Sequence, residues 1–399
     1  MNHFRYFKLL SLWSIVALIY CLEFFIRVSP NTLQEYLHQD LAINYSQLGE
    51  VSAFFYYSYA LFQIPSGWLL NRFGINSFFS IFPLIFSISL YFFSYSSSLL
   101  DACISRFFMG LGASITFTAL LHMAHEWFDQ KNFSKFVSVA NLFGMIGALA
   151  SSYPLEILLL NNSWQNITRN LSYLLIALTI FVFILLKIIN PINPRDFEED
   201  IEIPDYFDKK LFIKLLFIAV AIASPIMILP EMWGSLFLEE IYGLSEMLSG
   251  KIISLFFIGI ICGNFLNIFF RKEFAPLRIL KLTIIIELIC VSFFISGFNM
   301  SPFFLAFSAL LIGSCASSML LTFTMVQSLF PNKSFSLALF NIGVMLFPAF
   351  IQPLIGLAID IGPLLGLKIS STLKISMYLL PALLLPAYTV ANSIVEKDN

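Results

Sequence analysis

The chain is poor in charge. Only 12% of its 399 residues are Asp, Glu, Lys or Arg, whereas 59% are hydrophobic. Soluble domains carry about 25% charged residues, so a soluble fold of this length would lack the side chains to cover its surface. The composition therefore excludes an ordinary soluble protein. With a mean hydropathy of +0.86, it predicts an integral membrane protein whose main partner is the lipid bilayer.

Basic excess and metal-ligand patterns are missing as well. The formal net charge is -2, which gives no reason to expect a nucleic-acid partner. All five cysteines lie inside apolar runs without metal-ligand spacing, so we expect no disulfide, no metal site and no cofactor. The apolar stretch near the start lacks a small-residue cleavage site and is interpreted as an uncleaved first span.

Long hydrophobic runs recur along the whole chain. A transmembrane helix needs about 20 mostly apolar residues. The runs predict an all-α integral membrane fold with twelve transmembrane helices, at 8–29, 46–70, 75–95, 99–121, 135–159, 168–189, 211–232, 245–270, 277–298, 302–327, 335–359 and 373–393. The most polar break predicts a cytoplasmic linker at 190–210. It would join an N-terminal six-helix bundle, 1–189, to a C-terminal six-helix bundle, 211–399.

The basic residues predict the orientation. Sixteen of the 22 Lys and Arg, Lys135 among them, fall on the side of both termini, whereas Lys368 falls on the other. Positive residues are enriched in cytoplasmic loops. We therefore expect a multi-pass protein of the bacterial inner membrane with both termini in the cytoplasm.

Two pairs of segments correspond between the predicted halves. Gly67-Trp-Leu-Leu-Asn71 in the second span matches Gly263-Asn-Phe-Leu-Asn267 in the eighth, at an offset of 196. Asn141 in the fifth span corresponds to Asn341 in the eleventh, and Pro-Leu follows 13 residues after the first and 12 residues after the second. Matches at nearly one offset indicate two pseudo-symmetric halves. Many secondary transporters are built in this way, with the substrate site between the halves near the midplane.

Several motifs resemble those of the major facilitator superfamily. They are Tyr59-x3-Gln63-x-Pro65-x-Gly67-x3-Asn71-Arg72-Phe73-Gly74, Arg106-x3-Gly110-x-Gly112-Ala113 and Gly144-x2-Gly147-Ala148. Glu231-x-Trp233-Gly234 and Gln352-Pro353-x2-Gly356-x3-Asp360 are similar to a bacterial branch that includes phagosomal transporters of intracellular pathogens. The resemblance implies two pseudo-symmetric six-helix bundles that work by alternating access.

The resemblance also implies gating and packing roles. Asn71 stands where the family usually carries Asp, so the cytoplasmic latch is reduced to Arg72 and should be weak. The fifth span lacks the Gly-Pro-Gly signature of drug/proton antiporters, which makes efflux less favoured. The small residues expected at sliding helix contacts are Gly67, Gly74, Gly110, Gly112, Gly144 and Gly147.

Polar residues share helical faces in the first two spans. In the first span Tyr20, Glu23 and Arg27 are spaced i, i+3, i+7 and lie on one face. The same spacing recurs in the second span at Tyr56, Tyr59 and Gln63. A charge at the bilayer centre costs at least about 2.5–3.5 kcal/mol, so these faces are expected to line a cavity. The alternative for Arg27, near the outer end of its span, is snorkelling to the headgroups.

Two arginines are candidates for binding an anionic group. Arg106 lies about two turns inside the fourth span and should sit at a depth similar to that of Arg27. A guanidinium suits bidentate recognition of a carboxylate. Arg106→Lys should then impair transport more than folding, whereas a structural salt bridge is the alternative role for this arginine.

Proton coupling needs a buried carboxylate that can gain and lose a proton. Glu23 is the first candidate and Glu231 the second, although Glu231 and Trp233 could instead form an outer gate or an interfacial anchor. Other polar residues inside spans would bind substrate or join helices by hydrogen bonds. They are Asn141, Asn341 and Gln352.

The combined prediction is a secondary active transporter, not an enzyme. It would move a small organic solute, an amino acid or small organic acid, as a monomeric proton symporter. Export of a siderophore or a drug-like compound remains the alternative within transporters. A polytopic membrane transferase is the alternative of another class, but it would need a catalytic cluster on sizeable loops, which the sequence does not offer.

Overall fold

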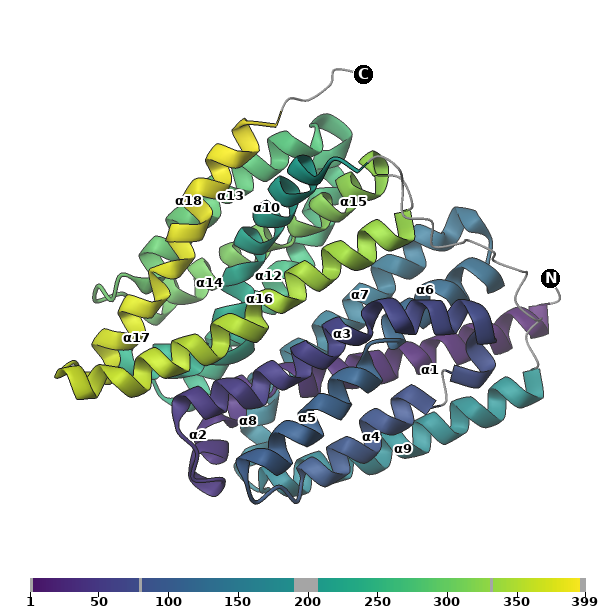
Figure 1. Ribbon diagram of the computed structural model, residues 1–399, viewed down its shortest axis with the longest axis horizontal. Helices are drawn as coiled ribbons and strands as arrows, with labels where there is room; N and C mark the ends of the chain where they lie inside the picture. The colour runs from purple at the N-terminus through teal and green to yellow at the C-terminus, as the bar shows by residue number, and fades with distance from the viewer. Residues whose placement is uncertain (1–2, 79–80, 190–206, 331–332, 395–399) are drawn as a thin grey trace.

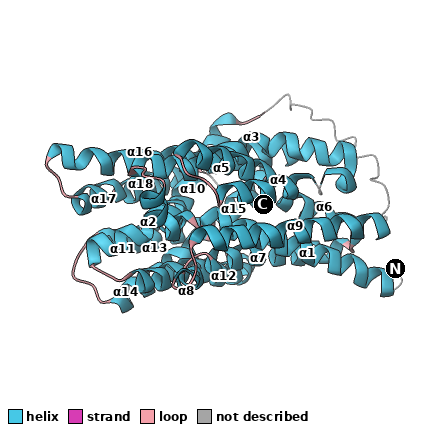
Figure 2. Ribbon diagram, turned by 90° about the horizontal axis from the view of Figure 1, so that it is seen from below, coloured by secondary structure: helices cyan, strands magenta, loops and turns pink. Residues whose placement is uncertain are grey.

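A computed structural model describes residues 3–78, 81–189, 207–330 and 333–394. Figure 2 shows helices and connecting loops throughout these segments, without a strand. The side chains of 66–78 are outside the description, and so is most of the predicted linker, 190–206. The exact division of the chain at 190–210 therefore stays a prediction.

The first half of the chain contains α1 to α9. Proline opens two of these helices, where its fixed φ suits the first turn and its missing N–H costs nothing. The Ser98 hydroxyl caps α5 by accepting from the Asp101 N–H at 3.2 Å. The elements are α1 (His3–Val28), α2 (Pro30–Asp40), α3 (Tyr45–Phe78), α4 (Ile81–Phe93), α5 (Leu99–Ala113), α6 (Thr116–Trp127), η1 (Gln130–Asn132), α7 (Phe133–Ala150), α8 (Tyr153–Leu159) and α9 (Trp164–Ile189).

The second half contains α10 to α18. Its first span is interrupted by a π-helical turn, η2, between two α-helical segments. The elements are α10 (Lys209–Ile228), η2 (Leu229–Trp233), α11 (Gly234–Tyr242), α12 (Glu246–Glu273), α13 (Pro276–Ile295), α14 (Pro302–Ala316), α15 (Met319–Leu329), α16 (Lys333–Ile361), η3 (Gly362–Leu365), α17 (Ile369–Met377) and α18 (Leu379–Asn392).

Each of the twelve predicted spans coincides with a helix or a broken helix. Within the described segments, eight helices are long and apolar enough to cross a membrane, or nine when α7 and α8, bent by 42°, count as one span. The other three predicted spans correspond to α3, α4 and α13. Alpha13 is not among the nine because it carries three charged residues, Arg278, Lys281 and Glu287. The all-α membrane fold is thus confirmed.

The structure differs from the predicted spans in two local details. The second span was predicted to end at 70 and the third to begin at 75, but α3 continues to Phe78. Polar residues signal the end of the apolar run, whereas a helix can continue into water beyond the bilayer. The segment 30–40, which lies between the first two predicted spans, forms α2. Two features of the sequence are typical of a helix here: Pro30 at its start, and Leu33 and Leu37 one turn apart, which are buried in the structure.

Figure 1 shows α1–α9 and α10–α18 as two groups of helices, with α3 and α16 packed along each other between them. The Asp360 carboxylate on α16 accepts hydrogen bonds from the N–H groups of Tyr45, at 3.0 Å, and Ser46, at 2.8 Å. Gly356 permits this approach, since a Cβ there would lie 2.2 Å from the Tyr45 carbonyl oxygen. A carboxylate from one half thus caps the N-terminus of a helix of the other.

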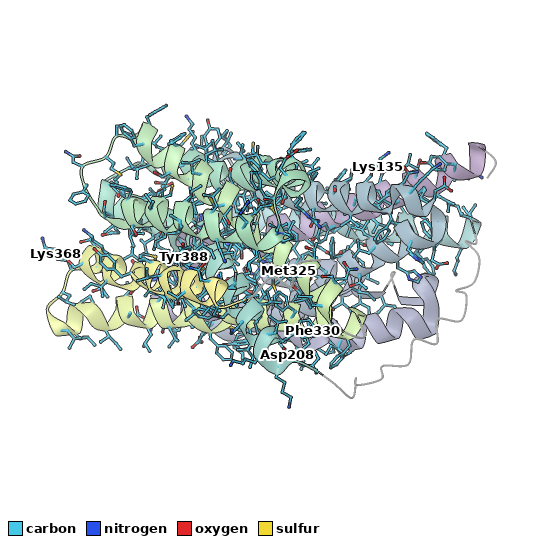
Figure 3. All side chains as sticks on the ribbon, turned by 90° about the horizontal axis from the view of Figure 1, so that it is seen from above. Lys135, Asp208, Met325, Phe330, Lys368 and Tyr388 are labelled. Atoms are coloured by element: carbon cyan, nitrogen blue, oxygen red, sulfur yellow. The ribbon has the colours of Figure 1, made fainter. Side chains whose placement is uncertain are left out.

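Two lysines mark the opposite ends of the long axis of the molecule. Lys135 and Lys368, predicted on opposite sides of the membrane, lie toward opposite ends in Figure 3. Alpha2 and α17 both pack against α11, so they mark the end to which Lys368 belongs. We call this the α2 end. Its assignment to the outer side of the membrane rests on the distribution of Lys and Arg and stays a prediction.

Candidate transport site

The first helix directs one face toward a small internal cavity. Its lining residues come from α1, α3 and α5: Tyr20, Glu23, Phe24, Arg27, Phe55, Tyr59 and Ala113. Arg27 is 8% exposed and Glu23 is 2% exposed. Both side chains therefore turn into the protein. This burial is incompatible with the alternative in which Arg27 snorkels to the headgroups.

Arg27 is paired with an acid from the other half of the chain. Its Nη2 lies 3.3 Å and 3.4 Å from the two carboxylate oxygens of Glu231. The Tyr56 hydroxyl donates to the same carboxylate, and Arg27 Nε donates to the Tyr56 oxygen at 3.4 Å. The three side chains join α1, α3 and η2 in one buried cluster, which we call the Arg27 cluster.

The local sequence explains the unusual position of Glu231. Pro225 and Pro230 lack the N–H groups that a regular helix needs, and the chain forms the π-helical turn η2 at this point. Such turns are frequent at functional sites because they change the direction in which a side chain projects. Glu231 is almost fully buried and reaches Arg27 across the two halves of the chain.

The Arg27 guanidinium retains one unused edge. In the described part of the chain, Nη1 has no hydrogen-bond partner, whereas Nε and Nη2 do. The charge also lies over two aromatic faces, 4.9 Å from the centre of the Phe24 ring and 5.1 Å from that of Tyr56. Because Arg27 lines the cavity, Nη1 faces a space of about 10 Å³, which is room for about one water molecule.

Glu23 has a different environment. Its Oε1 accepts from the Thr116 hydroxyl at 2.8 Å, and within the described segments its Oε2 has no hydrogen-bond partner. Thr116 begins α6, directly after the break that divides the predicted fourth span. This contact was missed from the sequence, where nothing marks Thr116 as a partner. Although Glu23 is about one turn from Arg27 on the same helix, the arginine pairs with Glu231.

Arg106 is used for structure. Its three nitrogens donate to main-chain carbonyls, from Nε to Val51 at 3.2 Å, from Nη1 to Ile26 at 3.0 Å and from Nη2 to Arg27 at 3.3 Å. Two of these carbonyls belong to the last turn of α1, where no helical donor is available. Arg106 therefore holds the end of α1, and with it the backbone of Arg27. In contrast to the prediction, it does not line the cavity, and it forms no salt bridge with any described residue.

The remaining polar candidates fall into two groups. Gln352 is fully buried and donates from Nε2 to the Met227 carbonyl at 2.8 Å, so it joins α16 to α10. The indole of Trp233 is buried near the ring of Tyr45, with 6.4 Å between ring centres. These two residues belong to the contacts around η2 and are not cavity-lining groups.

The second group faces the space between the halves. Tyr56 belongs to the Arg27 cluster, whereas Tyr59 lines the cavity and lies close to the Asn341 side chain of α16. Gln63, about one turn farther along α3, is half-buried. Asn141 is half-buried on α7. Tyr59 and Asn341 thus bring the two halves together next to the cavity, whereas Asn141 is not among the residues that line it.

Glycines allow the helices around the site to touch. A Cβ on Gly147 would lie 1.9 Å from the Cys21 carbonyl oxygen of α1, and one on Gly110 would lie 2.1 Å from that of Phe55. Gly112 meets α4 and Gly144 meets the ring of Tyr20. Other predicted gating residues, Gly67, Asn71, Arg72 and Gly74, fall among side chains outside the described residues. The latch prediction therefore stays a prediction.

The sequence is similar to known transporters. The model of the Major Facilitator Superfamily matches residues 14–353. A "probable sulfoacetate transporter" of Cupriavidus necator is 27% identical over 123 residues, 29% of this chain and 29% of that protein. A "probable galactarate/D-glucarate transporter" of Pseudomonas putida is 28% identical over 135 residues, 32% of this chain and 28% of that protein. The matched segments thus span less than a third of each relative.

Solved structures match over almost the full length. The D-xylose-proton symporter has a TM-score of 0.77 at 14% identity and covers 98% of both chains. A bacterial homologue of the human lysosomal transporter Spinster, in an inward-facing and unoccupied conformation, has a TM-score of 0.73 at 14% identity, covering 98% of this chain and 97% of that one. These likenesses confirm the fold. The family and its relatives are transporters, which confirms that the chain is not an enzyme and excludes the transferase alternative.

Proposed function

Because the chain belongs to the major facilitator superfamily, we propose that it is a secondary active transporter for a small organic anion that carries a carboxylate. The observation that carries this proposal is the buried Arg27 guanidinium, which lines the cavity and keeps Nη1 without a protein partner in the described segments. Planar guanidinium and carboxylate groups match in geometry and charge.

The names of the relatives support the same chemistry. Sulfoacetate, galactarate and D-glucarate are all organic anions with at least one carboxylate. An amino acid offers a carboxylate too, and Glu23 in the same cavity could receive its ammonium group. The relatives favour a small organic acid. None of the observed contacts favours a siderophore or a drug-like compound.

Glu23 is the proposed proton carrier. One of its oxygens is bound only to the neutral hydroxyl of Thr116, and the described residues provide no cation within salt-bridge distance. An ionised carboxylate in such surroundings is costly, which favours a bound proton when the cavity is closed to water. Opening the cavity to water would remove this constraint and release the proton. Glu231, in contrast, already has a cation and a hydroxyl as partners.

The proposal includes a location. The protein would act as a monomer in the bacterial inner membrane, with both termini in the cytoplasm, because most Lys and Arg lie on that side of the predicted topology. The solute would pass between the two halves by alternating access. In this structure, described contacts such as Asp360 to Ser46 join the halves at the α2 end.

Reconstitution into proteoliposomes tests the function. Uptake of labelled sulfoacetate, galactarate, glutamate and a neutral sugar would be measured with and without an inward proton gradient. We expect accumulation of at least one carboxylate anion, faster with the gradient, and none of the neutral sugar. Arg27→Gln should abolish this uptake, whereas Arg169→Gln, which removes a half-buried surface arginine bound to the Tyr95 hydroxyl, should not. Equal uptake by wild type and Arg27→Gln would contradict the proposal.

A further inference from the structure

We propose that Glu231 occupies Arg27 in place of the substrate carboxylate, and that exchange of the two carboxylates releases the contact between the halves at the α2 end. This inference rests on the proposed function and adds a mechanism of regulation to it. It starts from the observation that the residue best suited to hold an anion already holds one from the protein, 204 residues away in sequence.

The geometry of the pair indicates that it can be displaced. Both oxygens of Glu231 approach the same nitrogen, Nη2, at 3.3 Å and 3.4 Å. Charge-assisted hydrogen bonds of this kind are usually about 2.7–2.9 Å, and the strong form uses two parallel bonds to two nitrogens. A substrate carboxylate on the Nη1–Nη2 edge would make that bidentate contact. It needs the nitrogen that Glu231 uses, so the two anions compete.

Displacement of Glu231 would act on the contact between the halves. Glu231 lies on η2, whereas Arg27 and Tyr56 belong to α1 and α3. Four residues after Glu231, Ser235 exchanges two hydrogen bonds with the Asn31 side chain of α2, at 2.9 Å and 3.1 Å. The Arg27 cluster and this pair join the same segments. Without the ion pair, the hydrogen bonds described between α2 and the start of α11 are the neutral ones of Asn31 and Ser235.

The consequence is a difference between the empty and the loaded protein. In the empty protein, separation of the halves would leave two buried charges without partners, which is unfavourable. In the loaded protein, Arg27 keeps an anionic partner and Glu231 becomes exposed to water as the halves part. The ligand therefore binds the opened state better than the closed one, which is the requirement for a population shift. When Glu231 returns to Arg27, it expels the substrate carboxylate.

Spin-label distances across the α2 end test this exchange. Labels would be placed at Gln39 and Lys368, which are exposed in the two halves, after replacement of the five native cysteines. The proteins compared are wild type, Glu231→Gln and Glu287→Gln, the last as a matched control because Glu287 is a fully buried acid of α13. The probe is succinate, with neutral succinamide as its control.

We expect Glu231→Gln to populate longer distances without any ligand, whereas Glu287→Gln should resemble wild type. Succinate, but not succinamide, should shift wild type toward the same longer distances. The concentration of succinate at half effect should fall about tenfold in Glu231→Gln, because the internal competitor is gone; this corresponds to about 1.4 kcal/mol.

Three results would overturn the exchange. One is an unchanged distance distribution in Glu231→Gln. The second is a higher half-effect concentration in that variant, which would make Glu231 a ligand of the substrate. The third is a wild-type distribution that does not respond to succinate. Failure of the proposed function gives a different result. If the distances and half-effect concentrations are as expected but proteoliposomes take up no anion, the exchange of carboxylates holds and the transport role does not.

Discussion

Arg27 and Arg106 are both buried intramembrane arginines, but their surroundings differ in kind. Arg27 lines a cavity, pairs with a carboxylate from the other half of the chain and has one amino group without a hydrogen bond to any described residue. Arg106 is 1% exposed, and its guanidinium donates hydrogen bonds to three main-chain carbonyls. The comparison teaches that a charge inside the membrane does not by itself identify a binding site. The partners of the charged side chain indicate whether it can bind a ligand or holds the backbone in place.

Arg106 should give the largest effect on folding. Arg106→Ala removes three buried hydrogen bonds from a charged group, each worth about 1.5–3 kcal/mol, so we expect a loss of about 4–9 kcal/mol in sum. Thermal unfolding of purified protein in detergent would measure it. Arg106→Lys should be intermediate, because an ammonium lacks the planar fork. This reverses the prediction from sequence that Arg106→Lys would impair transport more than folding.

The control for Arg106 is Arg169, whose guanidinium donates to the exposed Tyr95 hydroxyl at 3.0 Å. Arg169→Lys should leave the melting temperature nearly unchanged, since exposed contacts contribute little. If Arg106→Lys had the melting temperature of wild type but no transport activity, Arg106 would have a role in substrate transport and not in stability.

Arg27 should respond to a second substitution in a way that Arg106 does not. Arg27→Gln alone leaves Glu231 buried without its cation and should cost about 3–5 kcal/mol. The double variant Arg27→Gln with Glu231→Gln removes both charges and should recover most of this stability. Its anion uptake should still be absent. Thermal unfolding and proteoliposome uptake would be measured on the three proteins.

The opposite pattern would remove the distinction between the two arginines. If the double variant transported the anion like wild type, Arg27 would have a structural role similar to that of Arg106. For Arg106, the three carbonyl partners offer no second charge to remove, so no comparable rescue is expected.

Glu23 should affect coupling more than stability. Glu23→Gln keeps an oxygen that can accept from the Thr116 hydroxyl, so we expect a stability change of only about 1 kcal/mol. Because an amide cannot carry the proton, an inward proton gradient should no longer accelerate uptake, while exchange of labelled for unlabelled anion should continue. Comparing gradient-driven uptake with exchange separates the two. Unchanged gradient dependence would leave another group as the proton carrier.

Asp360 should give the smallest effect. Asp360→Asn keeps one acceptor for the first turn of α3 but loses the favourable charge near the helix N-terminus, a change of about 0.3–1 kcal/mol. We expect a modest increase of the longer distances between labels at Gln39 and Lys368. An increase larger than that of Glu231→Gln would mean that the α3–α16 contact, and not the Arg27 cluster, is the main connection at this end.

Much of the fold was predictable because a helix that crosses a bilayer needs an apolar run of about 20 residues, which can be recognised in the sequence. Each predicted span coincides with helical structure. Breaks inside spans were less predictable. Nothing in the apolar run marks the break between α5 and α6, and Pro225 and Pro230 indicate a disturbed helix near η2 without indicating a π-helical turn. Alpha2 was missed because it is only 11 residues long and partly polar. The shared face of Tyr20, Glu23 and Arg27 was predictable because helical spacing alone defines it, and all three line one cavity.

The sequence by itself determined the solvent, the class of fold and the family. Composition, run length and short motifs are local properties, and a bilayer leaves an apolar chain few structures besides helices. Only the tertiary structure decided which charge meets which partner. Arg27 pairs with Glu231 across 204 positions, and Arg106 reaches a carbonyl 79 positions away. Such contacts depend on how helices pack in three dimensions, and a buried charge accepts whichever partner that packing brings within reach.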